Sequence, residues 1–313
     1  MDPMKRRFIL FMVFGLLPAL LLPAAVSPTA KMFKGQVMSL ETAGLSLQER
    51  SAAACRQFAK ERDGDGFFTA WAFPVCERIN SCQRHRAGSE SGPMSVKSRN
   101  GRIVVNSDGD HSLNISDGPG AKKDDASWGV LIFLHQVENG RCRISDVQLL
   151  APDRIYDLGG ERLAWLGAAD ETRGLEFIRS LLTAGDPGRE LRKDLVFALY
   201  LFNGQAAVGE LIGLARRDPD TEVRKDAIFW LGQKASTAAV KALGDVIASP
   251  EALEIKKAAV FALSQLPEDK GTPLLLQIAR QNPHPRLRKE AIFWLGQSGD
   301  GRALDFFEEI LLK

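Results

Sequence analysis

The sequence predicts a two-domain α+β protein, in which a small antiparallel β-rich domain precedes an α-solenoid of helix pairs. Three observations support this prediction: a 32-residue repeat whose copies begin at positions 190, 222, 254 and 286, short strand-like segments before it, and cysteines confined to those segments. The expected parts are a signal peptide or anchor over residues 1–30, a linker over 31–46, the β-rich domain over 47–157 and the solenoid over 158–313.

The N-terminus has the pattern of an export signal. Lys5, Arg6 and Arg7 precede an apolar stretch over residues 8–26, which contains two prolines and leads into small residues. This order is typical of a cleavable secretory signal peptide. A retained anchor is the alternative, because the stretch just reaches the ~18 residues that a membrane span needs. In both cases we expect the body outside the cytoplasm, periplasmic or secreted, with membrane contact only if the stretch is retained.

The cysteines favour disulfides over a metal site. All of them, Cys55, Cys76, Cys82 and Cys142, precede the repeats. An even number in an exported protein predicts two disulfides, for which three connectivities exist. A zinc site is disfavoured, because Cys76, Cys82 and His85 do not have the close pairing of structural zinc ligands.

Residues 47–61 have the amphipathic pattern of a helix, which a Gly- and Asp-rich turn ends. The aromatic-rich segment 67–75 predicts a strand. Further strands are expected over residues 101–106, 112–115, 128–136 and 142–150, between turn clusters. Asn139-Gly140 between the last two segments predicts a hairpin. Residues 31–46 lack sustained periodicity, which is why a linker is expected there.

Each copy of the repeat contains two apolar-patterned segments with a break between them, which is the mark of a helical solenoid. A proline lies just before each first helix, at Pro187, Pro219, Pro250 and Pro283, where it ends one helix and favours the start of the next. Residues 161–185 are expected to form a degenerate first repeat, because 161–167 echo the Phe-Trp-Leu-Gly of later copies.

The unit D-P-D-x-E-V-R-K-D-A-I-F-W-L-G-Q over residues 218–233 resembles HEAT repeats of the short bacterial class, the type also seen in phycobilisome lyases. The resemblance covers the C-terminal half only. It implies stacked helix pairs in a right-handed superhelix, and a surface that grips other proteins. Iron-dependent HEAT enzymes resemble this fold too, but they need His-Glu pairs that this sequence lacks.

In the second copy, Val223, Ala227, Trp230 and Leu231 fall on one face of the first helix, which is expected to form the core. Phe229 lies nearly opposite this face. Every copy has phenylalanine at that position, namely Phe197, Phe229, Phe261 and Phe293. These rings either form an exposed stripe that binds a partner, or lie in the grooves between adjacent first helices.

Two further patterns concern contacts between layers. The position after each phenylalanine alternates between small and large, with Ala198, Trp230, Ala262 and Trp294, which predicts interlocking layers. Each first helix also opens with a basic pair, such as Arg192-Lys193 and Arg224-Lys225. Acidic residues follow three of the four pairs, so we expect a salt-bridge ladder between repeats rather than a cationic binding surface.

The sequence predicts no catalytic, cofactor-binding or metal-binding residues. The four histidines, His85, His111, His135 and His284, are scattered and match no metalloprotease motif, and no P-loop or nucleophile motif is present. The Asp-x-Asp pairs at 63–65 and 108–110 lack the glutamate of a calcium loop. A net charge of +2 without a basic run gives no reason to expect nucleic acid as a partner.

We therefore expect an exported, non-catalytic protein–protein interaction or scaffold protein without a cofactor. Self-association through the C-terminal end, near Phe306 and Phe307, is a further expectation. One alternative is a lyase-like maturation or chaperone factor for a prosthetic group, which depends on the resemblance alone. The other is a membrane-tethered regulator, if residues 8–26 remain as an anchor.

Overall fold

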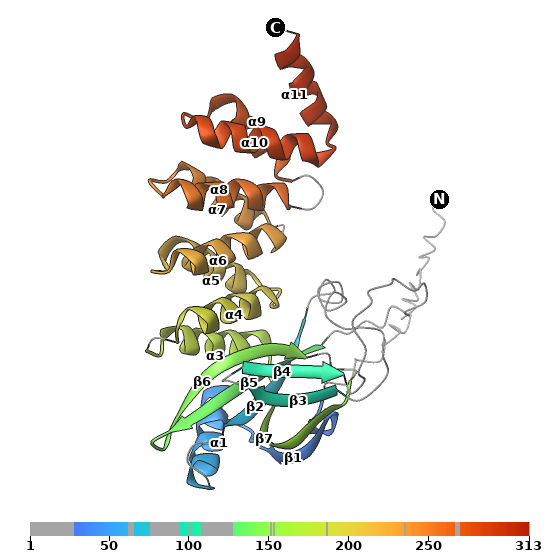
Figure 1. Ribbon diagram of the computed structural model, residues 1–313, viewed down its shortest axis with the longest axis vertical. Helices are drawn as coiled ribbons and strands as arrows, with labels where there is room; N and C mark the ends of the chain where they lie inside the picture. The colour runs from blue at the N-terminus through green and yellow to red at the C-terminus, as the bar shows by residue number, and fades with distance from the viewer. Residues whose placement is uncertain are drawn as a thin grey trace, which may run out of the picture.

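A computed structural model describes residues 28–61, 66–75, 94–99, 102–107, 128–150, 152, 154–185, 187–234, 236–266 and 270–312. A strand-rich part is followed by a stack of helices, with the sheet at one end of the stack and the C-terminus at the other (Figure 1). The predicted fold class is confirmed. The predicted strand over 112–115, the segment 1–27, Cys76 and Cys82 lie outside the described residues.

The described strands form one seven-stranded sheet in the order β4-β3-β7-β2-β5-β6, with β1 paired to β7. Their bounds are β1 Phe33–Ser39, β2 Phe67–Pro74, β3 Met94–Arg99, β4 Arg102–Ser107, β5 Trp128–Glu138, β6 Arg141–Leu150 and β7 Tyr156–Ala168. The β2–β5, β5–β6 and β3–β4 pairs are antiparallel, whereas β7 pairs in parallel with β1, β2 and β3. The sheet is therefore mixed, and the expectation of a mainly antiparallel domain holds for only part of it.

Two segments differ from the sequence predictions. Strand β1 lies inside the expected linker, because its backbone pairs with the distant β7. Residues 161–167 belong to β7 and not to a helix of a degenerate repeat. Leu163, Ala164, Trp165 and Leu166 are all fully buried, and a continuous apolar run suits a strand covered on both faces as well as it suits a helix.

The two faces of the sheet belong to different apolar clusters. Strand β2 shows this clearly, since Phe68, Ala70 and Ala72 face one cluster while Phe67 and Trp71 face the other. The second cluster is covered by helices, including α1 (Leu47–Glu61) and α3 (Glu171–Thr183), and it continues through the whole solenoid. The sheet and the solenoid therefore share one core.

Trp71 is the main contact between the sheet and the helices. Its ring lies 6.2 Å from that of Phe177 on α3 and 6.2 Å from that of Phe202, which follows α4. A Cβ on Gly174 of α3 would lie 2.8 Å from both Trp71 and Phe202. Glycine at this position therefore allows the close approach of α3 to the sheet.

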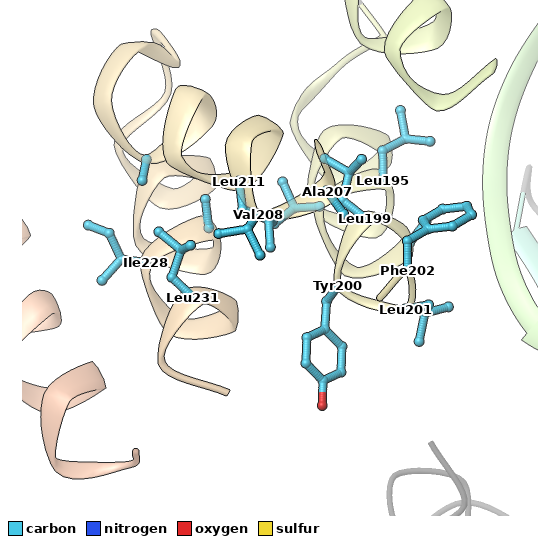
Figure 2. Packing of buried hydrophobic residues seen from close by; sticks show 14 of the residues in the cluster. Leu195, Leu199, Tyr200, Leu201, Phe202, Ala207, Val208, Leu211, Ile228 and Leu231 are labelled. Atoms are coloured by element: carbon cyan, nitrogen blue, oxygen red, sulfur yellow. The ribbon is translucent and has the colours of Figure 1, made fainter. Parts of the chain in front are cut away.

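The remaining helices form pairs. Their bounds are α4 Arg189–Tyr200, α5 Gln205–Arg217, α6 Thr221–Lys234, α7 Thr237–Ala248, α8 Leu253–Ser264, α9 Thr272–Gln281, α10 Pro285–Ser298 and α11 Gly301–Leu311. The first helices α4, α6, α8 and α10 pack on one another in chain order. Leu199, Val208, Leu211 and Leu231 meet between α4, α5 and α6 and are buried (Figure 2). These pairs are the repeating layers that the 32-residue period predicts.

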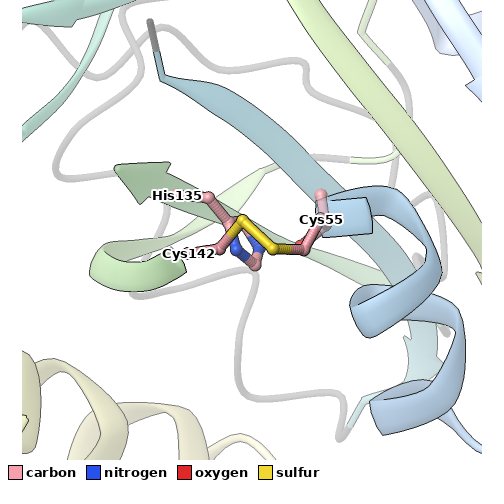
Figure 3. Close-up of a disulfide and its surroundings, with 4 residues drawn as sticks. Cys55, His135 and Cys142 are labelled. Atoms are coloured by element: carbon pink, nitrogen blue, oxygen red, sulfur yellow. A yellow bond between two sulfur atoms is a disulfide. The ribbon is translucent and has the colours of Figure 1, made fainter. Parts of the chain in front are cut away.

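A disulfide joins Cys55 of α1 to Cys142 of β6, beside His135 (Figure 3). It covalently attaches the helix to the sheet. The other two cysteines fall outside the described residues, so the predicted second disulfide stays a prediction. Across the stretches that the structure describes, every helix is too short or too polar to cross a membrane.

Candidate protein-interaction surface

A row of aromatic rings follows the first helices across the stack. We define the aromatic row as Tyr200 and Phe197 of α4, Phe229 and Trp230 of α6, Phe261 of α8, and Phe293 and Trp294 of α10. Neighbouring ring centroids lie 4.5 Å apart at Tyr200–Trp230, 6.3 Å at Phe229–Phe261 and 4.9 Å at Phe261–Trp294. These separations are those of interacting aromatic pairs. The row is therefore continuous from α4 to α10.

The four equivalent phenylalanines are not in equivalent surroundings. Phe197, Phe229 and Phe261 are half-buried, and each contacts a ring of the next first helix. These three lie in the grooves between helices, as the second sequence interpretation expects. Phe293 is 55% exposed, because among the described residues α10 is the last first helix. Binding of a partner at these rings stays a prediction.

The core face of α6 differs in part from the prediction. Val223, Ala227 and Leu231 are fully buried as expected, but Trp230 is only half-buried and Ile228 takes a core position. Trp230 instead covers Tyr200 of the preceding layer. The small partners in the alternation, Ala198 and Ala262, are buried, so large and small side chains do interlock between layers.

The two tryptophans of the row differ in their hydrogen bonding. The Nε1 of Trp294 donates to the Glu290 carboxylate at 3.1 Å. The equivalent acid beside Trp230 is Asp226, which lies 3.5 Å from the Lys193 ammonium instead. Within the described part of the chain, the indole N–H of Trp230 has no hydrogen-bond partner. A half-buried ring with a free donor is a suitable contact for a partner's carbonyl group.

Ion pairs connect successive layers, as the basic pairs predict. The Arg192 guanidinium lies 2.6 Å from the Asp218 carboxylate, and the Arg224 guanidinium lies 2.5 Å from the Glu251 carboxylate. In each case the cation is on a first helix and the acid precedes the next one. The second helices are connected in the same way through Arg179–Glu210, Arg216–Asp245 and Arg280–Glu309. These charges are largely neutralised inside the stack.

The ladder ends on α10. Within the described residues, Arg286, Arg288 and Lys289 have no acidic partner, and Arg288 Nη1 donates to the Asn282 carbonyl oxygen at 2.8 Å. In the earlier copies the first position is a glutamate, which accepts from Lys225 at 2.9 Å in α6. Arg286 replaces that glutamate in α10. Uncompensated positive charge therefore lies near the exposed Phe293, a feature that the repeat pattern alone did not indicate.

A second charged cluster lies where the sheet meets α4. The Arg102 guanidinium is 3.5 Å from the carboxylate of the buried Asp146 and 3.4 Å from that of Asp194. Burial raises the pKa of Asp194 to about 7; the Arg102 charge opposes this rise, and the Asp146 carboxylate adds to it. This cluster couples the position of the solenoid to the sheet.

The two histidines in the described regions, His135 and His284, lie in different parts of the fold. His135 is fully buried, stacks on Phe67 and is hydrogen-bonded through Nε2 to Thr69 Oγ1 at 2.9 Å. Burial lowers the pKa of His135 to about 3, so it is neutral. His284 caps α10, where its Nδ1 accepts from the Arg286 N–H. His85 and His111 lie outside the described residues, among which no three His, Cys, Asp or Glu side chains converge as metal ligands.

The family model of HEAT repeats matches residues 209–280 and 248–313. HEAT repeats therefore occupy residues 209–313, within the helical C-terminal half, and the resemblance noted in the sequence is confirmed. No curated protein matches the chain. HEAT repeats generally mediate protein–protein interactions. The matched region contains the part of the aromatic row on α6, α8 and α10, whereas Phe197 and Tyr200 on α4 precede it.

Proposed function

We propose that this protein is an exported, non-catalytic interaction or scaffold protein, which binds a protein partner on the face formed by its first helices. The observation that carries the proposal is the aromatic row, which runs unbroken from Tyr200 to Phe293. Tryptophan and tyrosine are enriched among the residues that dominate binding energies at protein interfaces. Both tryptophans of the row are half-buried, and Phe293 is exposed. The stripe predicted from Phe197, Phe229, Phe261 and Phe293 is the centre of this proposed surface.

The surroundings of the row also suit a partner. Gln233 is half-buried and Gln265 is exposed, and each lies one helical turn beyond a phenylalanine of the row. Both amides offer a donor and an acceptor. Together with the free Trp230 indole N–H, they add polar contacts to an apolar strip, which is the usual composition of a specific interface.

Export is supported by two features. The basic, apolar and small residues over 5–30 have the order of a signal peptide, and the Cys55–Cys142 disulfide suits an oxidising compartment. N-terminal sequencing of the mature protein tests this part. A start near Pro28 or Lys31 supports a periplasmic or secreted protein, whereas retention of residues 8–26 makes the protein a membrane-tethered regulator.

Photo-crosslinking in intact cells tests the binding face. A photoreactive residue at position 233 or 265 is expected to form discrete adducts with another protein. The matched controls are positions 206 and 209, which are exposed on the second helix α5. Adducts from the α5 positions alone, or from neither set, would contradict a first-helix binding face.

The lyase-like alternative has a separate test. If the solenoid held a tetrapyrrole, titration of the purified protein would shift the absorbance spectrum of the pigment. We expect no shift, because the rings of the aromatic row pack on one another.

A further inference from the structure

The last first helix repeats the face of α6 that receives the next layer. Residues 227–233 of α6 and 291–297 of α10 have the same sequence, Ala-Ile-Phe-Trp-Leu-Gly-Gln. Arg224 and Arg288 also occupy equivalent positions at the start of these helices. Over these positions the two helices therefore present the same side chains to a helix that packs on them, while the glutamate at position 222 is Arg286 in α10.

On α6 this face is filled by α8. Phe229 stacks on Phe261, the Arg224 guanidinium is paired with Glu251, and Ile228 is fully buried. The contact is so close that a Cβ on Gly232 would lie 2.6 Å from the carbonyl oxygen of Ala262. A helix that packs on this face must therefore supply an apolar side chain and an acidic residue, and it must approach closely.

On α10 the same face is open. Phe293 is 55% exposed, and Ile292 is only half-buried. A Cβ on Gly296, the equivalent of Gly232, would meet only the Phe307 ring at 3.8 Å. Arg286, Arg288 and Lys289 lack acidic partners in the described chain. The face is therefore apolar and positively charged, and its chemistry suits a helix that carries acidic side chains.

Helix α11 carries the complementary features. It projects from the end of the stack (Figure 1), where Arg280 holds it through the Glu309 carboxylate and the Phe306 ring. Phe306 is therefore buried. The other side of α11 is apolar and acidic, with Leu304 61% and Leu311 82% exposed. Its exposed acids are Asp305 and Glu308.

We infer that α10 of one copy binds α11 of a second copy and the reverse, which gives a two-fold symmetric, end-to-end dimer. Each interface is formed twice, as symmetry requires. In each, the cations of α10 meet Asp305 and Glu308, while Phe293 meets the exposed Leu304 and Leu311, which lie two turns apart on one side of α11, as anchors of a helix in a groove do.

A head-to-tail arrangement does not fit. The other end of the stack is covered by the sheet, where Trp71 packs on Phe177 and Phe202. The proposed dimer leaves the aromatic row between α4 and α8 accessible. It therefore goes beyond the proposed function: it does not need a protein partner, and although it covers Phe293, it leaves the rings of α4, α6 and α8 able to bind one.

Charge reversal followed by mixing tests the dimer on the full mature chain. Variant one carries Arg286→Glu and Lys289→Glu, so that α10 and α11 are both acidic. Variant two carries Asp305→Lys and Glu308→Lys, so that both helices are basic. Sedimentation velocity over a concentration series is expected to show a wild-type dimer and at least a tenfold weaker association of each variant alone. An equimolar mixture is expected to restore a dimer that contains one copy of each, because both of its interfaces then join opposite charges.

One control variant and one further test variant accompany the charge reversals. Glu176→Lys on α3 changes an exposed charge far from this end and should leave the dimer intact. Leu311→Ser removes a side chain that is 82% exposed and should weaken association about tenfold without affecting the fold. A monomeric wild type, dimers of either charge variant as stable as those of the wild type, or no association on mixing would each overturn the inference. Dimerisation is measured on the purified protein alone, whereas the partner is sought by crosslinking at positions 233 and 265, so the two proposals fail separately.

Discussion

The carbonyl oxygen of Ala262 on α8 lies 2.6 Å from the point that a Cβ of residue 232 on α6 would occupy. Backbone atoms cannot move aside locally, so Gly232→Ala should force the two layers apart. We expect a loss of about 1–3 kcal/mol in the free energy of unfolding, the cost of overpacking, although alanine favours the helix. Urea denaturation monitored by circular dichroism measures this loss of stability.

Gly296→Ala is the matched control for that substitution. The added Cβ would meet only the Phe307 ring at an ordinary contact distance of 3.8 Å. We expect no loss, and a gain of up to about 1 kcal/mol from helix propensity. Equal losses for both variants would show that the close approach of α8 to α6 is not the cause.

The buried ion pair between layers should matter more than the exposed one. Side-chain exposure is 17% for Arg192 and 0% for Asp218, so Asp218→Asn leaves a buried guanidinium without its counter-ion. We expect a loss of about 3 kcal/mol in unfolding free energy. Arg189→Ala removes a neighbouring pair whose arginine is 59% exposed, and should leave the urea midpoint nearly unchanged. The reverse order of effects would contradict this account of the ladder.

The Asp194 carboxyl should make stability depend on pH. Its folded-state pKa of about 7 lies above its ordinary value of 3.8. Between these values the unfolded chain is ionised while the folded protein holds the proton, so this group's contribution to stability falls as pH rises from about 4 to 7. Asp194→Asn removes the penalty. Its urea midpoint should exceed that of the wild type at pH 8 and approach it at pH 5.

A difference between the wild type and Asp194→Asn that is the same at both pH values would contradict the raised pKa. Asp146 and Arg102, the charges nearest to Asp194, remain in both proteins.

The disulfide should stabilise the β-rich domain. It joins residues separated by 87 positions, and closing a loop of that size raises the free energy of the unfolded chain by about 4.6 kcal/mol. Replacing Cys55 and Cys142 together by serine should lower the urea midpoint, without leaving a thiol that can exchange with Cys76 or Cys82. Peptide mapping of the oxidised wild type should recover the Cys55 and Cys142 peptides linked; recovery of either one linked to Cys76 or Cys82 would contradict the pairing.

The solenoid could be predicted from the sequence because each layer is specified by local periodicity that recurs every 32 residues. The sheet could not, since its strands depend on distant partners. Strand β1 shows little pattern of its own and exists because β7 pairs with it across more than a hundred residues. The Trp165 region resembles a repeat helix in composition, and only its pairing with β1 and β2 makes it a strand.

The sequence predicted that the candidate surface contains a row of phenylalanines and salt bridges, but it did not predict which of these side chains are covered. The recurring phenylalanine indicated a row, yet which rings are covered depends on the next layer, so Phe261 is half-buried and Phe293 is exposed. The basic pairs likewise indicated salt bridges. That Arg288 lacks an acid follows from the absence of a further first helix in the described chain, which the pair itself does not reveal.

Hydrogen–deuterium exchange of the protein with its cross-linked partner tests the central claim most directly. If the first helices bind the partner, amides of α6 and α8 should exchange more slowly in the complex, while those of α5, α7 and α9 keep their rates. Protection confined to the sheet or to the second helices would contradict a binding face along the aromatic row.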